Sequence, residues 1–60
     1  KELWDAISKL PKKQRSVVVM RIADELPYKE ISNVTGMSES AAKVNFHHAL
    51  QKLKEVLNNE

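Results

Sequence analysis

Apolar residues recur at a helical period in the first half of this chain. Leu3, Ile7 and Leu10 are three or four residues apart and precede a proline, which disfavours helical geometry in the residue before it. This pattern predicts a helix over residues 2–9. The next segment contains three successive valines, which favour a strand locally, but no other part of the chain offers a partner strand. We therefore predict a second helix over residues 12–24.

Proline, glycine and serine mark the ends of two further helices. Pro27 suits the start of a helix because its φ is fixed and it lacks an N–H, and Gly36 can adopt the positive φ of a C-terminal cap. Ser38 can then cap the N-terminus of the next helix. These residues predict helices over 28–35 and 39–57, and hence an all-α fold of four helices. The expected single core contains Ile31, Val34, Ala42, Phe46, Ala49 and Leu53.

The length of the chain limits what such a fold can do. A domain of 60 residues buries only roughly 60% of the surface that its unfolded chain exposes, so a deep enzyme cleft is not expected. The chain has no cysteine, which excludes disulfides and thiolate metal sites, and its longest apolar run, residues 17–20, is too short to span a bilayer. We expect one soluble intracellular domain and, because it begins at Lys1 rather than Met, a piece of a longer protein.

The charge of the chain is weakly basic. Ten Lys and Arg residues against eight Asp and Glu residues give a net charge of +2, and the excess lies in residues 1–27. Any binding to nucleic acid would therefore depend on a few placed phosphate contacts rather than on a strong general field.

Residues 28–57 have the outline of a helix-turn-helix: a short helix, a link that contains glycine, and a longer helix with small residues at its start. The spacing alone leaves a plain helical hairpin open. The longer helix has an apolar stripe through Ala42, Phe46, Ala49 and Leu53, and its opposite face mixes small, aliphatic, basic and imidazole side chains. This mixed face carries Ser40, Val44, His47 and Gln51, flanked by Lys43 and His48.

Catalytic and metal-binding patterns are not found in the sequence. His47 and His48 are adjacent, so on a helix they point about 100° apart, whereas two helical ligands of one ion are spaced three or four residues apart. No nucleophile elbow, glycine-rich phosphate loop or clustered carboxylate pair occurs. We therefore expect neither enzymatic activity nor a metal or other cofactor.

The features of residues 10–53 occur together in a known family. They are a Leu-Pro pair, a following Arg, a second Arg after an apolar residue, a helix start of the form Leu-Pro-Tyr-Lys-Glu-Ile-Ser, a Gly, and a last helix with Ala-Lys-Val. In this order and spacing they resemble region four of bacterial sigma factors of the extracytoplasmic-function group. The matching residues are Leu10, Pro11, Arg15, Met20, Arg21, Leu26, Pro27, Tyr28, Glu30, Ile31, Ser32, Gly36, Ala42, Lys43, Ala49 and Leu53.

The resemblance implies a bacterial cytoplasmic domain that acts in transcription initiation. Its last helix would enter the major groove of the promoter's minus-35 element while the domain is attached to the flap of the RNA polymerase beta subunit. An anti-sigma factor is a further expected partner, and the absence of a long seam favours a monomer. The family's base-facing positions fall on Lys43, Val44, His47 and His48, and the helical face adds Ser40.

Phosphate contacts are expected from the start of the first motif helix and from one flanking cation. Tyr28 and Lys29 stand where free N–H groups and the helix dipole favour an anion, and Arg21 matches a basic position that the family uses on the DNA backbone. A salt bridge between Arg21 and Glu25, four residues on, is the alternative. Arg15 is assigned a structural role, in capping or pairing.

Two other functions remain open at this stage. The last helix also resembles that of the output domain of two-component or quorum-sensing regulators, although residues 10–21 favour the sigma factor. A helical protein-interaction module, bound by a regulator of the anti-sigma type, is the alternative from another class. Its apolar ridge would comprise Leu3, Trp4, Ile7, Val17, Val18 and Leu57.

Overall fold

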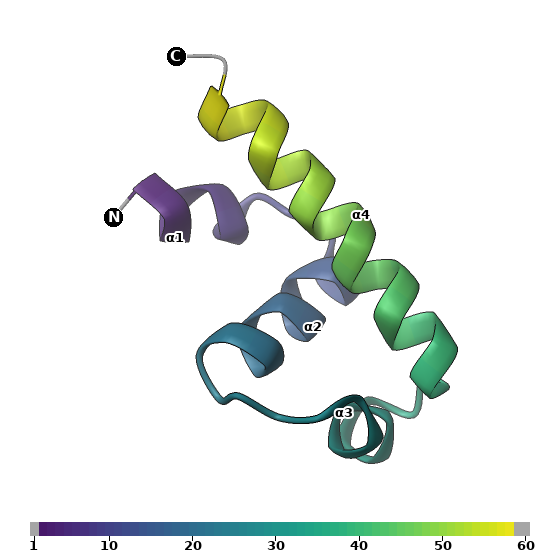
Figure 1. Ribbon diagram of the computed structural model, residues 1–60. Helices are drawn as coiled ribbons and strands as arrows, with labels where there is room; N and C mark the ends of the chain where they lie inside the picture. The colour runs from purple at the N-terminus through teal and green to yellow at the C-terminus, as the bar shows by residue number, and fades with distance from the viewer. Residues whose placement is uncertain (1, 59–60) are drawn as a thin grey trace.

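Residues 2–58, the part of the chain that the computed structural model describes, form four α-helices and no strand. The helices are α1 (Glu2–Ser8), α2 (Lys12–Ile22), α3 (Tyr28–Thr35) and α4 (Glu39–Asn58). The long helix α4 packs against each of the other three: α1 lies beside its C-terminal half, α2 crosses its middle, and α3 lies near its start (Figure 1). The all-α prediction is therefore confirmed.

The sequence prediction differs most from the structure at the end of α2, whereas the ends of α1 and α4 differ from it by one residue each. The helix ends at Ile22 rather than at residue 24. The N–H of Ala23 still donates to the Val19 carbonyl in the helical pattern, at 2.8 Å, but the N–H of Asp24 donates to the same carbonyl, at 3.2 Å, instead of to that of Met20. Glu25 then takes a left-handed φ of 55°, and the N–H of Leu26 donates to the Met20 carbonyl at 2.9 Å. The helix is thus followed by a wide turn with a left-handed residue, formed without the glycine that usually takes this conformation.

The turn between α3 and α4 is built as the sequence predicts. Gly36 adopts a φ of 81° and its N–H donates to the Ser32 carbonyl at 2.9 Å, which ends α3. The Ser38 hydroxyl accepts the N–H of Ala41 at 3.0 Å and so caps the start of α4. The Thr35 hydroxyl joins the two ends, because it donates to the Ile31 carbonyl and accepts the N–H of Met37.

Replacement of Gly36 by alanine tests this turn. No atom lies within 4 Å of the place where a Cβ would be, so the loss comes only from the left-handed backbone. We expect Gly36→Ala to lower the free energy of unfolding by about 1 to 2 kcal/mol in urea denaturation. Asn33→Ala, on the exposed side of α3, is the matched control and should change it by less than about 0.5 kcal/mol. Equal stability of the two variants would contradict this account of the turn.

The core consists of two clusters rather than one. The first joins α1, α2 and α4 through Ala6, Ile7, Leu10, Val18, Ala49 and Leu53. The second joins α2, α3 and α4 through Val17, Ile31 and Ala42. The half-buried ring of Phe46 packs against both clusters.

Two expected core residues are therefore placed differently from the prediction. Phe46 is only half-buried, and Val34 is 62% exposed. The buried side of α3 is centred between Ile31, Thr35 and Tyr28, and Val34 lies roughly 100° around the helix from that centre. Because α3 has only two turns, one side of it is covered. The spacing from Ile31 alone did not show whether Val34 or Thr35 lies on that covered side.

Arg15 has the structural role assigned to it. Its Nη1 lies 3.5 Å from the Ser8 carbonyl and 3.4 Å from the Leu10 carbonyl, so it donates to backbone oxygens at the end of α1. The guanidinium thereby connects the start of α2 to α1 and satisfies carbonyls that the helix itself leaves free.

Candidate nucleic-acid interface

The five residues expected to face bases lie on one exposed side of α4. We call Ser40, Lys43, Val44, His47 and His48 the recognition face, and all five side chains are exposed. On the opposite side of the helix, Ala42, Ala49 and Leu53 are buried. The recognition face therefore lies on the exposed side of α4.

Val44 is the unusual member of the recognition face. It is 51% exposed at the centre of a polar surface, where a β-branched side chain lowers helix propensity and gains little from burial. An apolar contact with a partner would compensate for both.

The two histidines point to different surroundings. His47 borders a groove formed with residues of α1 and α2, whereas His48 lies on the other flank of α4 near Gln14 and Glu55. No group of three His, Cys, Asp or Glu side chains within residues 2–58 is arranged to hold a metal ion. The adjacent histidines are thus separate surface groups.

The start of α3 presents free donors and one exposed cation. Pro27 is the N-cap residue and makes no side-chain capping bond to the first turn of the helix. Lys29 is exposed and Tyr28 is half-buried in this turn. Uncapped N–H groups, the helix dipole and a lysine together favour an anion here.

Tyr28 joins three of the four helices. The guanidinium carbon of Arg21, on α2, lies 4.6 Å from the centre of the Tyr28 ring, and the Lys43 Nζ, on α4, lies 5.7 Å from it. The Phe46 ring meets the Tyr28 ring edge to face, with centroids 6.3 Å apart and planes at 73°. Two residues expected to bind phosphate and one expected to face bases are therefore brought into a single cluster.

Arg21 is held within the domain by a partner that the sequence did not indicate. Its Nη1 donates to the Leu26 carbonyl at 2.9 Å, and its guanidinium also lies 5.7 Å from the Phe46 ring centre. Among the described residues, its hydrogen bond goes to this carbonyl and not to Glu25. A bond to a main-chain oxygen in a turn has no residue-type signal, so only the structure identifies it.

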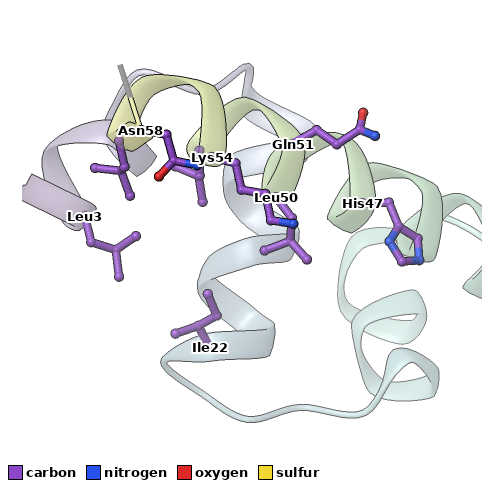
Figure 2. A pocket seen from close by; sticks show the side chains of 9 residues that line it. Leu3, Ile22, His47, Leu50, Gln51, Lys54 and Asn58 are labelled. Atoms are coloured by element: carbon purple, nitrogen blue, oxygen red, sulfur yellow. The ribbon is translucent and has the colours of Figure 1, made fainter. Parts of the chain in front are cut away.

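An apolar groove lies at the other end of the domain (Figure 2). It has a volume of about 520 Å³ and is lined by Leu3 of α1, Ile22 at the end of α2 and one side of α4. Leu3 and Ile22 are 37% and 40% exposed, although both are apolar. Residues of α4 complete the groove, namely His47, Leu50, Gln51, Leu53, Lys54, Leu57 and Asn58.

The apolar ridge expected from the sequence is only partly at the surface. Ile7, Val17 and Val18 are buried in the two core clusters, so they are not available to a partner. Leu3 and Trp4 are exposed and Leu57 is half-buried. Ile22 and Leu50 were missed, because their positions in a helical pattern do not show that the neighbouring helices leave them open.

A family comparison decides what kind of domain this is. The family model described as Sigma-70, region 4 matches residues 1–53. The chain belongs to this family. Its helix-turn-helix is therefore that of a sigma-70 region 4, and the output domain of two-component regulators is not favoured.

Sigma factors are also similar to this chain in sequence. The region 4 chain is 42% identical over 55 residues to the RNA polymerase sigma-E factor of Streptomyces antibioticus and 40% identical over 55 residues to that of Streptomyces coelicolor. It is 25% identical over 59 residues to the RNA polymerase sigma factor SigV of Bacillus subtilis. The alignments cover 92%, 92% and 98% of this chain but only 31%, 31% and 36% of those proteins. No solved structure was found to match this region 4 chain.

A helix that crosses a bilayer must be both long and apolar. None of the helices of this region 4 domain between residues 2 and 58 meets both requirements.

Proposed function

We propose that this region 4 domain recognises the minus-35 element of a promoter during transcription initiation, with α4 in the major groove. The observation that carries the proposal is the exposed recognition face on the second helix of the helix-turn-helix, opposite the buried Ala42, Ala49 and Leu53. A major groove admits one α-helix, and the small residues at the start of α4 allow close approach to base edges.

Each member of the recognition face has a chemistry suited to base edges. Lys43 can donate to O6 or N7 of a guanine, and the exposed methyl groups of Val44 can pack on a thymine methyl. His47 and Ser40 can exchange hydrogen bonds with neighbouring bases, and His48, on the flank of α4, lies nearer the DNA backbone.

The phosphate contacts are proposed at the end of the domain where α3 begins. The uncapped N–H groups of α3 and the exposed Lys29 favour a phosphate, and the Tyr28 hydroxyl adds a donor. The Arg21 guanidinium lies over the Tyr28 ring, so it adds positive charge at the same end of α3. Such contacts fix the register of α4 in the groove without selecting a sequence.

RNA polymerase is the proposed second partner, bound through the groove lined by Leu3, Ile22 and Leu50. A domain that offers few phosphate contacts needs a second attachment, because tethering to polymerase raises its effective concentration at the promoter. The groove lies away from the start of α3, and of the five residues of the recognition face its lining includes His47 alone (Figure 2). The flap of the beta subunit is the proposed element of polymerase, and an anti-sigma factor would compete for the same surface. We place this function in the bacterial cytoplasm, with the domain acting as a monomer.

Substitutions in the recognition face and at the start of α3 should affect DNA binding differently. Lys43→Met, Val44→Ala and His47→Ala should each change which base pairs are preferred, with a loss of about 1 to 3 kcal/mol confined to the contacted positions. Lys29→Gln should weaken all sequences alike. The measurement is selection of duplexes randomised across the minus-35 element at low salt. Unchanged base preference in all three α4 variants would overturn the groove assignment and leave a protein-docking module.

The isolated chain should bind DNA weakly and with a modest salt dependence. Three to five phosphate contacts give a slope of log K against log salt of roughly −3 to −4.5, at about −0.9 for each contact. Loss of the Lys29 charge should flatten this slope by roughly one unit. Fluorescence anisotropy over a salt series gives the slope, and nanomolar binding at physiological salt would contradict it.

A further inference from the structure

The cluster at the start of α3 contains an aromatic ring with two cations over it. Arg21 lies at 4.6 Å and Lys43 at 5.7 Å from the Tyr28 ring centre, both within the roughly 6 Å over which a ring attracts a cation. Tyr28 is half-buried, whereas Lys43 is an exposed side chain on the recognition face. The ring is therefore the fixed partner and the lysine the movable one.

We infer that Tyr28 is a positioning residue for Lys43, and that its ring determines how sharply the lysine discriminates between base pairs. This inference rests on the proposed function of the recognition face. It assigns the tyrosine a role distinct from the phosphate contact of its hydroxyl group.

The ring is held from α2 and from α4. Arg21 lies over it, and the hydrogen bond from Arg21 Nη1 to the Leu26 carbonyl fixes that guanidinium against the turn that precedes α3. The Phe46 ring packs edge to face on it from α4, one turn after Lys43. These contacts keep the ring in one orientation while α4 places Lys43 beside it.

An exposed lysine without such a partner has many rotamers of similar energy. Ordering a long side chain on DNA then lowers the gain from its contact, and a mobile ammonium can satisfy several acceptors about equally well. A ring that holds the ammonium near one position limits both effects. Point-charge donors such as lysine need this orientation more than arginine, whose planar donors are preorganised.

The test compares Tyr28→Leu with Tyr28→Phe in the randomised minus-35 selection. Tyr28→Phe keeps the ring and removes the hydroxyl, so it should weaken all sequences alike and leave the base preference unchanged. Tyr28→Leu also removes the ring, and it should reduce discrimination at the base pair read by Lys43 by roughly two- to fivefold. Thermal denaturation of both variants gives the folded fraction, for which the affinities are corrected.

The same substitution in a Lys43→Met background distinguishes positioning of Lys43 by Tyr28 from a general structural effect. If Tyr28 acts through Lys43, Tyr28→Leu should change no base preference once Lys43→Met is present, because the two substitutions then affect one contact. An equal change of preference in both backgrounds would overturn the inference, and so would unchanged preference in Tyr28→Leu alone. If Lys43→Met itself leaves the preference unchanged, the assignment of Lys43 to a base fails, and the role of Tyr28 fails with it.

Discussion

Replacement of Ile31 by alanine is expected to remove most of the stability of this domain. Ile31 is fully buried and forms the second core cluster with Val17 and Ala42, so it joins α2, α3 and α4. Truncation of a buried isoleucine to alanine typically costs about 2 to 5 kcal/mol, and the hydrophobic core of so small a domain rarely supplies more than about 3 to 5 kcal/mol. The variant should therefore be largely unfolded at 37 °C.

Urea denaturation followed by circular dichroism measures this loss. Val34→Ala is the matched control, since it truncates an aliphatic side chain of the same helix that is 62% exposed. It should change the free energy of unfolding by less than about 0.5 kcal/mol. Ile31→Val, which removes one methyl group, should fall between them at about 0.5 to 1.5 kcal/mol. Similar losses for Ile31→Ala and Val34→Ala would contradict the placement of Ile31 in the core and of Val34 at the surface.

The contrast between Ile31 and Val34 also shows what the sequence could establish about the fold. The period of apolar residues and the caps at Pro27, Gly36 and Ser38 were sufficient to place four helices. They were sufficient because caps and turns depend on local backbone chemistry. The end of α2 was missed because Glu25 takes the left-handed conformation that glycine usually takes. Local preference gives no warning of such a residue.

The candidate site also has a part that the sequence could predict and a part that it could not. The exposed side of α4 could be predicted, because burial of one stripe of a helix determines its opposite face. The contacts of Tyr28 with Arg21 and Lys43 could not, since they depend on how three helices approach one another. The apolar groove is a similar case. Ile22 and Leu50 fit an ordinary helical pattern, and their exposure arises only from the gap between α1, α2 and α4.

A charged residue in this groove is expected to have the second large effect, on binding to RNA polymerase. Leu50 is half-buried on the wall formed by α4, between His47 and Lys54. If a polymerase segment occupies the groove, Leu50→Glu would leave an unpaired carboxylate in a contact from which water is excluded. Loss of an apolar anchor of this kind costs about 2 kcal/mol or more, which is roughly a thirtyfold loss of affinity.

Binding of the fluorescently labelled chain to RNA polymerase core measures this effect, and Val56→Glu is the matched control. Val56 is an apolar residue of the same helix that is 45% exposed, but it lies outside the lining of the groove. It should leave polymerase binding within about a factor of two of the unmodified chain, since surface changes rarely exceed about 0.5 kcal/mol. Leu50→Glu should also retain the base preference of the recognition face, because four of the five residues of that face lie outside the groove lining. Equal effects of the two glutamates on polymerase binding would show that polymerase does not occupy this groove, while the base selections would still test α4 independently.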